Sequence, residues 1–212
     1  MLEGNSRIVI PGIDVSHYQG EIDWPKVAQS GEVQFAFIKA TDGSSGVDPT
    51  FYRNANQAQS AGILHGFYHF MRPNDVLGQI ANVRKVVGDN TLAIRPLMLD
   101  VEVDTITLGQ VELFLKVFPR AILYTDRAWI NANVLAPLKA ANAEGKNPPI
   151  PLWPIPLWLA EYGIANPDPV PWTTWTFWQY GTGRVPGICT IVDFDWFNGS
   201  LEQLQAFWKL PT

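Results

Sequence analysis

Apolar residues gather in eight short runs along the chain, separated by polar stretches that contain Gly, Pro, Asn and Asp. Short runs rich in β-branched and aromatic residues, bounded by turn-forming residues, are typical of β-strands. We therefore expect strands at 9–15, 34–39, 64–70, 95–102, 120–124, 157–161, 174–180 and 190–195.

Helical patterns follow each of the first five strands, and one more ends the chain. The residues that can cap the first turns of these helices are polar and short. They are Asp23, Asp48, Asn74, Thr107, Asp126 and Ser200. Gly31, Gly62 and Gly88 stand where the first three helices should end, because glycine readily adopts the backbone conformation found there.

Repeated strand–helix units predict parallel strands covered by helices. No helix fits between the sixth and eighth strands, so simple connections are expected there. The pattern indicates an α/β fold, an irregular TIM-like β/α barrel of eight strands. We expect one catalytic domain over 1–212, with an N-terminal extension at 1–8 and a Pro-rich loop at 140–156, where proline disfavours helix and sheet.

Composition narrows the classes of function. The net charge is −5, which argues against a nucleic-acid partner, and nine Trp suit stacking on sugar rings of a neutral glycan. No signal peptide and no membrane span are expected from the sequence. Cys189 is the single cysteine, so no internal disulfide can form, and its apolar neighbours suggest a core residue. We expect a monomer with neither metal nor cofactor, since no Cys/His cluster has metal-ligand spacing.

The stretch 95–104, RPLMLDVEVD, carries the most suggestive chemistry. Asp100 and Glu102 share one face of the expected strand, with their Cα atoms about 6.6 Å apart. Neighbouring carboxylates raise one another's pKa, which favours one ionised and one protonated group near neutral pH. The plainer interpretation is a strand end that surfaces into solvent, where both acids are simply hydrated.

A barrel favours the functional interpretation, because active sites of β/α barrels form at the carboxyl ends of the strands. The residues that the sequence places there are acidic, aromatic or amide. They are Asp14, Tyr68, Asp100, Glu102, Tyr124, Glu161, Trp178, Gln179, Asp193 and Asp195. We expect several of these carboxylates to share one site.

Eight segments resemble glycoside hydrolase family 25 lysozymes, the Chalaropsis-type muramidases of bacteria, fungi and phages. They are GIDVSHYQGEIDW (12–24), FAFIKATDG (35–43), AGILHGFYHF (61–70), PLMLDVE (96–102), ILYT (122–125), LWLAEY (157–162), TFWQYG (176–181) and VDFDWFNGS (192–200). The resemblance implies a barrel of eight strands with about five helices. It also implies hydrolysis of the β-1,4 bond between N-acetylmuramic acid and N-acetylglucosamine in peptidoglycan glycan strands.

The same resemblance implies an acidic quartet of Asp14, Asp100, Glu102 and Asp193, with Glu102 as the general acid. Tyr68, Tyr124, Trp178 and Gln179 match positions of the pocket walls, while Glu161 and Asp195 are further candidates for sugar contacts. The sequence departs from the family at Asp42, where many members carry Glu, and in its long Pro-rich loop.

Asp100 has two possible roles in a glycosidase of this kind. It could attack the sugar as a nucleophile, or it could orient the substrate acetamide, whose oxygen would then attack C1. We favour the second, a retaining mechanism with substrate assistance.

Two other functions remain compatible with the sequence. The acids could serve a metal-dependent hydrolase, or the barrel could bind peptidoglycan without cleaving it. In each peptidoglycan-directed case we expect action at the bacterial cell wall, after secretion, in the periplasm, or by release from a phage-infected cell.

Overall fold

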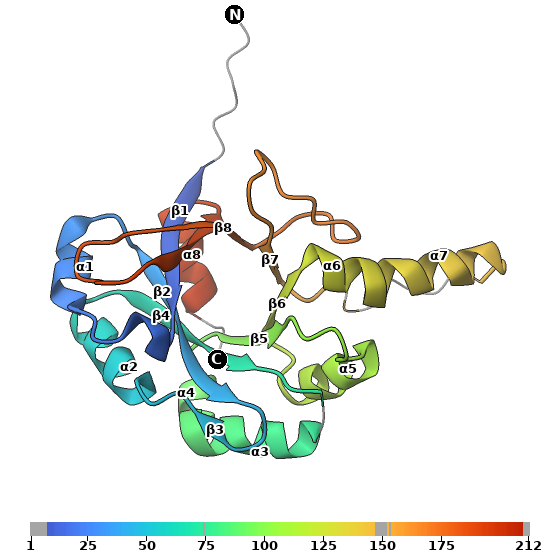
Figure 1. Ribbon diagram of the computed structural model, residues 1–212, viewed down its shortest axis with the longest axis horizontal. Coiled ribbons are helices and arrows are strands. Elements are labelled where there is room, and N and C mark those ends of the chain that lie inside the picture. The colour runs from blue at the N-terminus through green and yellow to red at the C-terminus, as the bar shows by residue number, and fades with distance from the viewer. Residues whose placement is uncertain (1–7, 74, 147–151, 153, 210–212) are drawn as a thin grey trace, which may run out of the picture.

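A closed barrel of eight strands forms the centre of the molecule (Figure 1). The computed structural model describes residues 8–73, 75–146, 152 and 154–209. The barrel strands are β1 (Val9–Val15), β2 (Phe35–Asp42), β4 (Leu64–Phe70), β5 (Leu97–Val101), β6 (Ile122–Asp126), β7 (Leu157–Ala160), β8 (Phe177–Gly183) and β9 (Val192–Asn198). They follow the order β1-β9-β8-β7-β6-β5-β4-β2, and pairing of β1 with β2 closes the ring. The predicted eight-stranded barrel is confirmed.

Strand direction departs from the expected parallel pattern at one place. The pairs from β1–β2 round to β7–β8 are parallel, but β9 runs antiparallel to both β8 and β1. The connection 184–191 explains this, because it is too short for a crossover helix and returns the chain directly alongside β8. A two-residue strand, β3 (Gly46–Val47), adds antiparallel to the end of β2.

Helices cover the outside of the barrel, and their first turns follow the predicted capping residues in most cases. The helices are α1 (Trp24–Ser30), α2 (Phe51–Ser60), α3 (Val76–Val87), α4 (Asp89–Leu92), α5 (Leu108–Val117), α6 (Arg127–Ile130), α7 (Ala136–Ala143) and α8 (Leu201–Trp208), together with the 3-10 turn His17–Gln19 and a π-helical segment Asn131–Leu135. Asp23, Thr107, Asp126 and Ser200 cap their helices as predicted.

Two predicted caps differ. Thr50, rather than Asp48, is the N-cap of α2, although the Asp48 carboxylate accepts the Thr50 backbone N–H at 2.9 Å. Asn74, the predicted cap of the third helix, lies outside the described residues, and Asp75 accepts the Gly78 N–H at 3.0 Å as the N-cap of α3.

The α6, π-helical and α7 segments follow one another without a break and project from the side of the barrel (Figure 1). The prediction of a loop from residue 140 is therefore wrong for 140–143, which belong to α7 because three alanines favour helix there. Within the rest of the Pro-rich stretch, 147–151 and 153 lie outside the described residues.

Strand alternation divides the core into two parts. Side chains such as Ile38, Leu99 and Leu123 point outward into the layer between strands and helices. The inward side chains form a separate aromatic cluster inside the barrel, to which Leu204 and Trp208 of α8 contribute. The indole N–H of Trp208 donates to the His65 backbone carbonyl at 2.8 Å, so α8 closes the end of the barrel where the parallel strands begin.

The inward residues change from apolar to polar along the parallel strands: Phe37 to Lys39, Met98 to Asp100, Ile122 to Tyr124, and Phe177 to Gln179. An apolar barrel floor thus gives way to a polar mouth at the carboxyl ends of the strands. This gradient is what places the polar groups of a site together.

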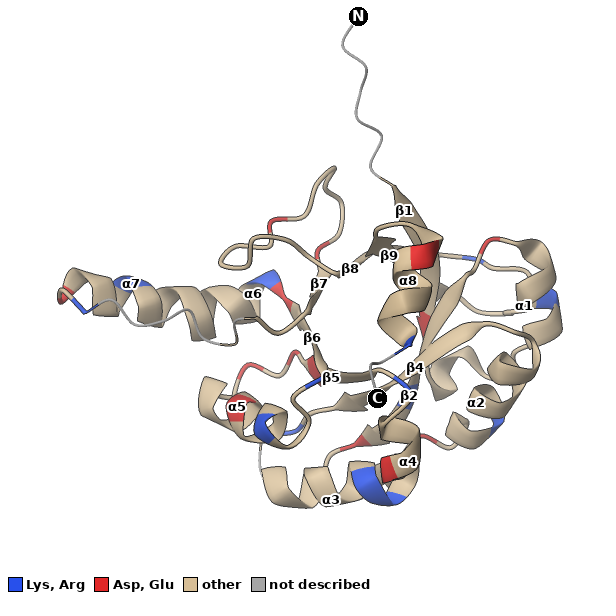
Figure 2. Cartoon of the chain, turned by 180° about the vertical axis from the view of Figure 1, so that it is seen from behind, with Lys and Arg blue, Asp and Glu red and all other residues tan. Residues whose placement is uncertain are grey.

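Basic residues are distributed over several helices. Lys and Arg lie on α1, α3, α6 and α7 in Figure 2, spread around the molecule rather than gathered on one face. Among the described helices, none combines the length and the apolar character needed to cross a bilayer.

Candidate active site

A pocket of about 330 Å³ opens at the polar mouth of the barrel. Side chains from β1, β2, β4, β5, β6, β7, β8 and β9 reach it, together with the segments that directly follow β1, β5 and β7. It is lined by Asp14, Ser16, Tyr18, Gln19, Lys39, Tyr68, Phe70, Asp100, Glu102, Tyr124, Trp158, Tyr162, Gln179 and Asp193. The structure therefore brings together all four acids and three of the wall residues that the sequence singled out.

Asp100 and Glu102 enter the pocket from β5 in different surroundings. Asp100 is buried within the strand, whereas Glu102 lies one residue beyond the end of β5 and is exposed. The Asp100 Oδ1 atom is buried and has no hydrogen-bond partner among the described residues. Burial, and next the charge of Glu102, raise the pKa of Asp100 well above its usual range.

Glu102 also holds its proton more tightly than an ordinary glutamate. Loss of hydration raises its pKa, and the negative charge of Asp126 raises it further. Lys39 and Arg72 act in the opposite direction, because a nearby cation favours the ionised carboxylate. The balance is a raised pKa on an acid that can reach a ligand.

Asp14 and Asp193 face each other across the pairing of β1 with β9, where they are register partners. The Asp14 carboxylate accepts a hydrogen bond from Gln179 Nε2 at 2.7 Å, and Gln179 Oε1 accepts the Tyr124 hydroxyl at 2.9 Å. Burial raises the pKa of Asp14, and the charge of Asp193 adds to the effect.

Asp193 is more exposed than Asp14, and burial raises its pKa as well. Its Oδ1 atom accepts the Tyr162 hydroxyl at 3.0 Å. Tyr162 was not expected at the site, although its position directly after the sixth apolar run was a usable signal, because that is where strand ends meet in a barrel.

Lys39 supplies a cation to the pocket wall. Its Nζ lies 3.1 Å from Asp42 Oδ2 and 4.5 Å from the centre of the Phe70 ring. Asp42 also accepts from Arg72 Nε at 2.6 Å. Lys39 and Asp42 thus form a salt bridge, and alternation with Phe35 and Phe37 could have shown that the Lys39 side chain also points into the barrel.

Three of the sequence-predicted site residues do not line this pocket. Trp178 points outward from β8, packs against Trp175 and Trp196, and donates its indole N–H to the Glu161 carbonyl at 2.7 Å. Stacking of Trp178 on a sugar in this pocket therefore does not fit, because outward and inward residues alternate and Gln179 takes the inward position.

Glu161 and Asp195 are the other two. The Glu161 carboxylate accepts the Asp168 backbone N–H at 2.8 Å, so its observed contact orders the loop after β7. Asp195 is fully buried beneath the pocket, where its Oδ1 accepts the Trp158 indole N–H at 2.7 Å. A direct sugar contact is excluded for a side chain without exposed surface.

The histidines near the mouth have structural partners. His69 is fully buried, with its Nδ1 2.8 Å from Thr41 Oγ1 and its ring stacked on Phe114. His17 Nδ1 lies 2.8 Å from Asp48 Oδ2. Neither lines the pocket.

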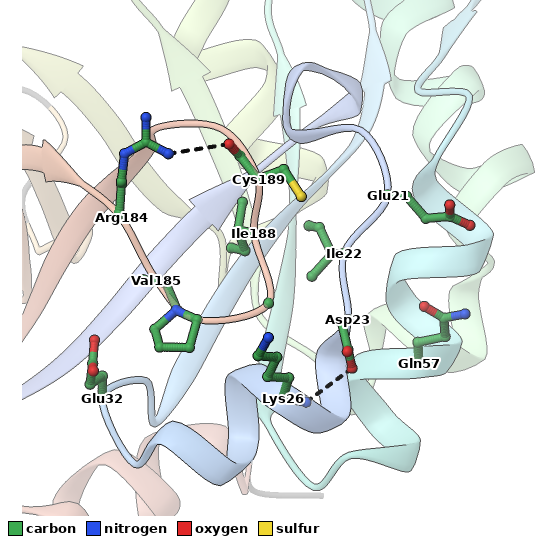
Figure 3. A pocket seen from close by; sticks show the side chains of 12 residues that line it. Glu21, Ile22, Asp23, Lys26, Glu32, Gln57, Arg184, Val185, Ile188 and Cys189 are labelled. Carbon is green, nitrogen blue, oxygen red and sulfur yellow. Dashed lines mark hydrogen bonds between the residues drawn. The ribbon is translucent and has the colours of Figure 1, made fainter.

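A larger and more open hollow of about 890 Å³ lies elsewhere, between the start of α1 and the loop from β8 to β9 (Figure 3). Its rim carries acids and bases mixed together, including Glu21, Lys26 and Arg184, and none of the four acids of the mouth. Cys189 lies on this rim and is exposed. The expected core position of Cys189 is wrong, because the apolar neighbours in sequence, Ile188 and Ile191, divide between a buried and an exposed side chain.

Metal binding was the other chemistry open to the acids. Within the part of the chain that the structure describes, no three His, Cys, Asp or Glu residues are grouped as ligands of one ion would be. The arrangement instead offers a proton-holding acid, a buried carboxyl with a free acceptor oxygen, and two further carboxyls on the opposite strands.

Comparison with known proteins identifies the family. Residues 13–188 match the model of Glycosyl hydrolases family 25. The chain is 34% identical to Lysozyme M1 of Streptomyces globisporus, over 93% of this chain and 70% of that protein, and 25% identical to N,O-diacetylmuramidase of Chalaropsis sp, over 96% and 99%. The fold matches the bacterial lysozyme from Streptomyces coelicolor with a TM-score of 0.77 and 33% identity, over 94% of this chain and 97% of that one. The chain therefore belongs to glycosyl hydrolase family 25 and is a glycoside hydrolase.

Proposed function

We propose that this enzyme is a muramidase, a 1,4-β-N-acetylmuramidase that hydrolyses the bond between N-acetylmuramic acid and N-acetylglucosamine in peptidoglycan. Similarity to a lysozyme and to a diacetylmuramidase over nearly the whole chain supports this substrate. The observation that carries the chemistry is the pair at the end of β5: Asp100 is buried within the strand, and Glu102, one residue beyond it, is accessible at the pocket.

Glu102 is the general acid in this proposal. Glycoside cleavage passes through an oxocarbenium-like state and needs a proton delivered to the leaving oxygen. A group that does this must hold its proton until the leaving oxygen takes it, and the raised pKa of Glu102 favours the protonated form. Its exposure at the mouth leaves it free to reach a bound glycan.

Asp100 orients the acetamide of the substrate. No residue in the described part of the chain hydrogen-bonds to its buried Oδ1, and an acetamide N–H that donates to this atom would satisfy it. Burial also raises the pKa of Asp100, which favours its protonated form, and a protonated carboxyl is a poor nucleophile. These two properties favour attack by the acetamide oxygen, which gives net retention at C1, over direct attack by Asp100.

Asp14 and Asp193 stabilise the positive charge that develops on the sugar, and Tyr68, Tyr124 and Gln179 form the walls that hold it. All of these side chains come from one chain, so a monomer contains the complete site. With peptidoglycan as substrate, the enzyme acts at the bacterial cell wall.

Stereochemistry tests this mechanism. We expect the newly formed reducing end to appear first as the β-anomer, which proton NMR of the early products resolves. We also expect a thiazoline analogue of the acetamide intermediate to inhibit competitively. An α-anomer as first product contradicts retention, and retention without thiazoline inhibition would instead favour Asp100 as a nucleophile.

A further inference from the structure

Asp195 is a carboxyl that no substrate can reach. It lies on the inward face of β9, two residues from Asp193, and has no exposed surface. Its partner across the strand pairing is Gly12, which has no side chain. The nearest carboxyl from β1 is therefore that of Asp14, and the two side chains are in hydrogen-bonding contact.

Few donors surround this pair. The Trp158 indole N–H satisfies Oδ1 of Asp195 at 2.7 Å, and no N–H or O–H group of the described residues reaches its Oδ2. Gln179 Nε2 donates to Asp14 Oδ2 at 2.7 Å, with the amide held in that orientation by the Tyr124 hydroxyl. Two carboxylates cannot hydrogen-bond to each other, so their contact requires a proton between them.

The surroundings indicate which carboxyl keeps that proton. Asp14 has an amide donor and lines the pocket, where water or substrate can solvate its charge. Asp195 has only the neutral indole donor and no contact with solvent. Ionising a carboxyl group without solvation costs free energy, so Asp14 is the member of the pair that ionises.

We propose that Asp195 is a positioning residue that remains protonated and donates a hydrogen bond to Asp14, which holds Asp14 in place as the anion beside the sugar. This proposal rests on the proposed function in one respect: it takes Asp14 as the member of the pair that faces the bound sugar. The two buried acids then carry one negative charge between them.

The other titratable groups near Asp195 agree with this assignment. Asp193 faces it from the same strand, and the hydroxyl groups of Tyr162 and Tyr180 lie close enough for its charge to affect them. All of them are acids, and the charges of Asp14 and Asp193 both raise the pKa of Asp195. Burial, and next the charge of Asp14, raise the pKa of Asp195 well above its usual range.

Two substitutions separate a proton donor from an anion. Asp195→Asn keeps the shape and still offers an N–H to Asp14, whereas Asp195→Ala offers none. We expect Asp195→Ala to lower kcat by on the order of 10- to 100-fold, the size expected for an unmade buried hydrogen bond. The acidic limb of its pH profile should move to higher pH, because Asp14 loses a donor that favours its ionised form.

Asp195→Asn should restore most of the activity and leave the acidic limb where the wild type has it. Were Asp195 an anion, Asp195→Asn would remove a negative neighbour of Asp14, and the limb would move to lower pH. That shift would overturn the proposal.

Infrared spectroscopy of the resting protein tests the proton directly and needs no substrate. The difference spectrum of wild type minus Asp195→Asn at neutral pH should contain the carbonyl stretch of a protonated carboxyl. A carboxylate band in its place overturns the proposal even if both proteins are active. The expected band in a protein that does not cleave peptidoglycan would uphold the shared proton and reject the proposed function instead.

Discussion

Asp100, near the end of β5, and Glu102, just beyond that strand, differ in accessibility, and this difference assigns them different proposed roles. Asp100 is buried with a free acceptor oxygen, whereas Glu102 is exposed past the strand end. Both have raised pKa values, and burial is the largest cause in each case. The local surroundings of each acid, rather than its residue type, thus decide which of the two can donate a proton to a ligand.

Glu102→Gln tests the proton donor. The amide keeps the shape of the side chain but cannot protonate the leaving oxygen, so kcat on peptidoglycan should fall by about 10²- to 10⁴-fold. The melting temperature should be unchanged or slightly raised, because the substitution removes one negative charge from a cluster of acids. Wild-type turnover in a folded Glu102→Gln protein would assign the proton donor to another residue.

The charges around Glu102 should set the alkaline limb of kcat/KM, which reports the free enzyme. Asp126 raises the pKa of Glu102, so Asp126→Asn should move this limb to lower pH. Asn still caps α6, which preserves the helix. Arg72 lowers the same pKa, so Arg72→Gln should move the limb to higher pH, as a control of opposite sign.

Shifts of several tenths of a pH unit are the size that one partly screened charge can produce at low salt. If both variants move the limb in the same direction, or neither moves it, a group other than Glu102 controls it. The measurement is kcat/KM across the pH range at constant ionic strength.

At the residue scale the sequence was sufficient for part of the site. Spacing of two predicted that Asp100 and Glu102 share a face, and position at strand ends brought Asp14 and Asp193 into consideration. Spacing could not distinguish Trp178 from Gln179, because which parity points inward depends on the register of the barrel. Burial of Asp195 depends in the same way on Gly12 and Trp158, which come from distant segments.

The strands place apolar side chains at one end of the barrel and polar side chains at the other. Inward positions of β2 and β8 begin with Phe35 and Phe177 and end with Lys39 and Gln179. The aromatic end is closely packed: the Phe35 ring lies 5.4 Å from that of Phe177 and 5.9 Å from that of Trp208. The site therefore stands on a rigid base.

Gly12→Ala tests this packing. A Cβ at Gly12 would lie 2.3 Å from Cζ of Phe35, a fully buried ring that cannot move aside. Overpacking of this kind should lower the free energy of unfolding by about 1–3 kcal/mol in urea denaturation. Gly109→Ala is the matched control, because nothing lies within 4 Å of its Cβ in α5, and it should stabilise by up to about 1 kcal/mol.

If Gly12→Ala leaves the free energy of unfolding unchanged, the aromatic layer is loosely packed.

The existence of the helices and strands was predictable from the periodicity of their apolar residues and from their caps, as Asp23, Gly31 and Thr107 illustrate. The direction of β9 was not predictable, because it depends on strand pairing. The helical start of the Pro-rich stretch was not predictable either, because it depends on the continuation of α7.

Taken as a whole, the molecule buries several ionisable groups whose titration couples its stability to pH. His69 is buried as a neutral imidazole, and burial lowers its pKa from 6.5 to about 4. Between these values the unfolded chain binds more protons than the folded one, so His69 makes the folded state less stable as the pH falls. The raised pKa values of Asp14 and Asp100 have the opposite sign, because there the folded state holds the extra proton.

His69→Gln isolates the histidine contribution, because Gln does not titrate. The difference between the unfolding free energies of wild type and His69→Gln should change in favour of the variant as pH falls from 7 to 4. The change should approach roughly 3 kcal/mol, the equivalent of the lowered pKa. A difference that stays constant over this range would mean that folding does not perturb the titration of His69.

Cleavage at the muramic acid bond is the central claim, and the identity of the new reducing sugar tests it most directly. Purified peptidoglycan is digested, the products are reduced with borohydride and the modified sugar is identified by mass spectrometry, with Glu102→Gln as the matched control. Muramitol derivatives from the wild type, and far fewer from Glu102→Gln, are the predicted result. Glucosaminitol derivatives, or no new reducing ends from the folded wild type, would contradict the account.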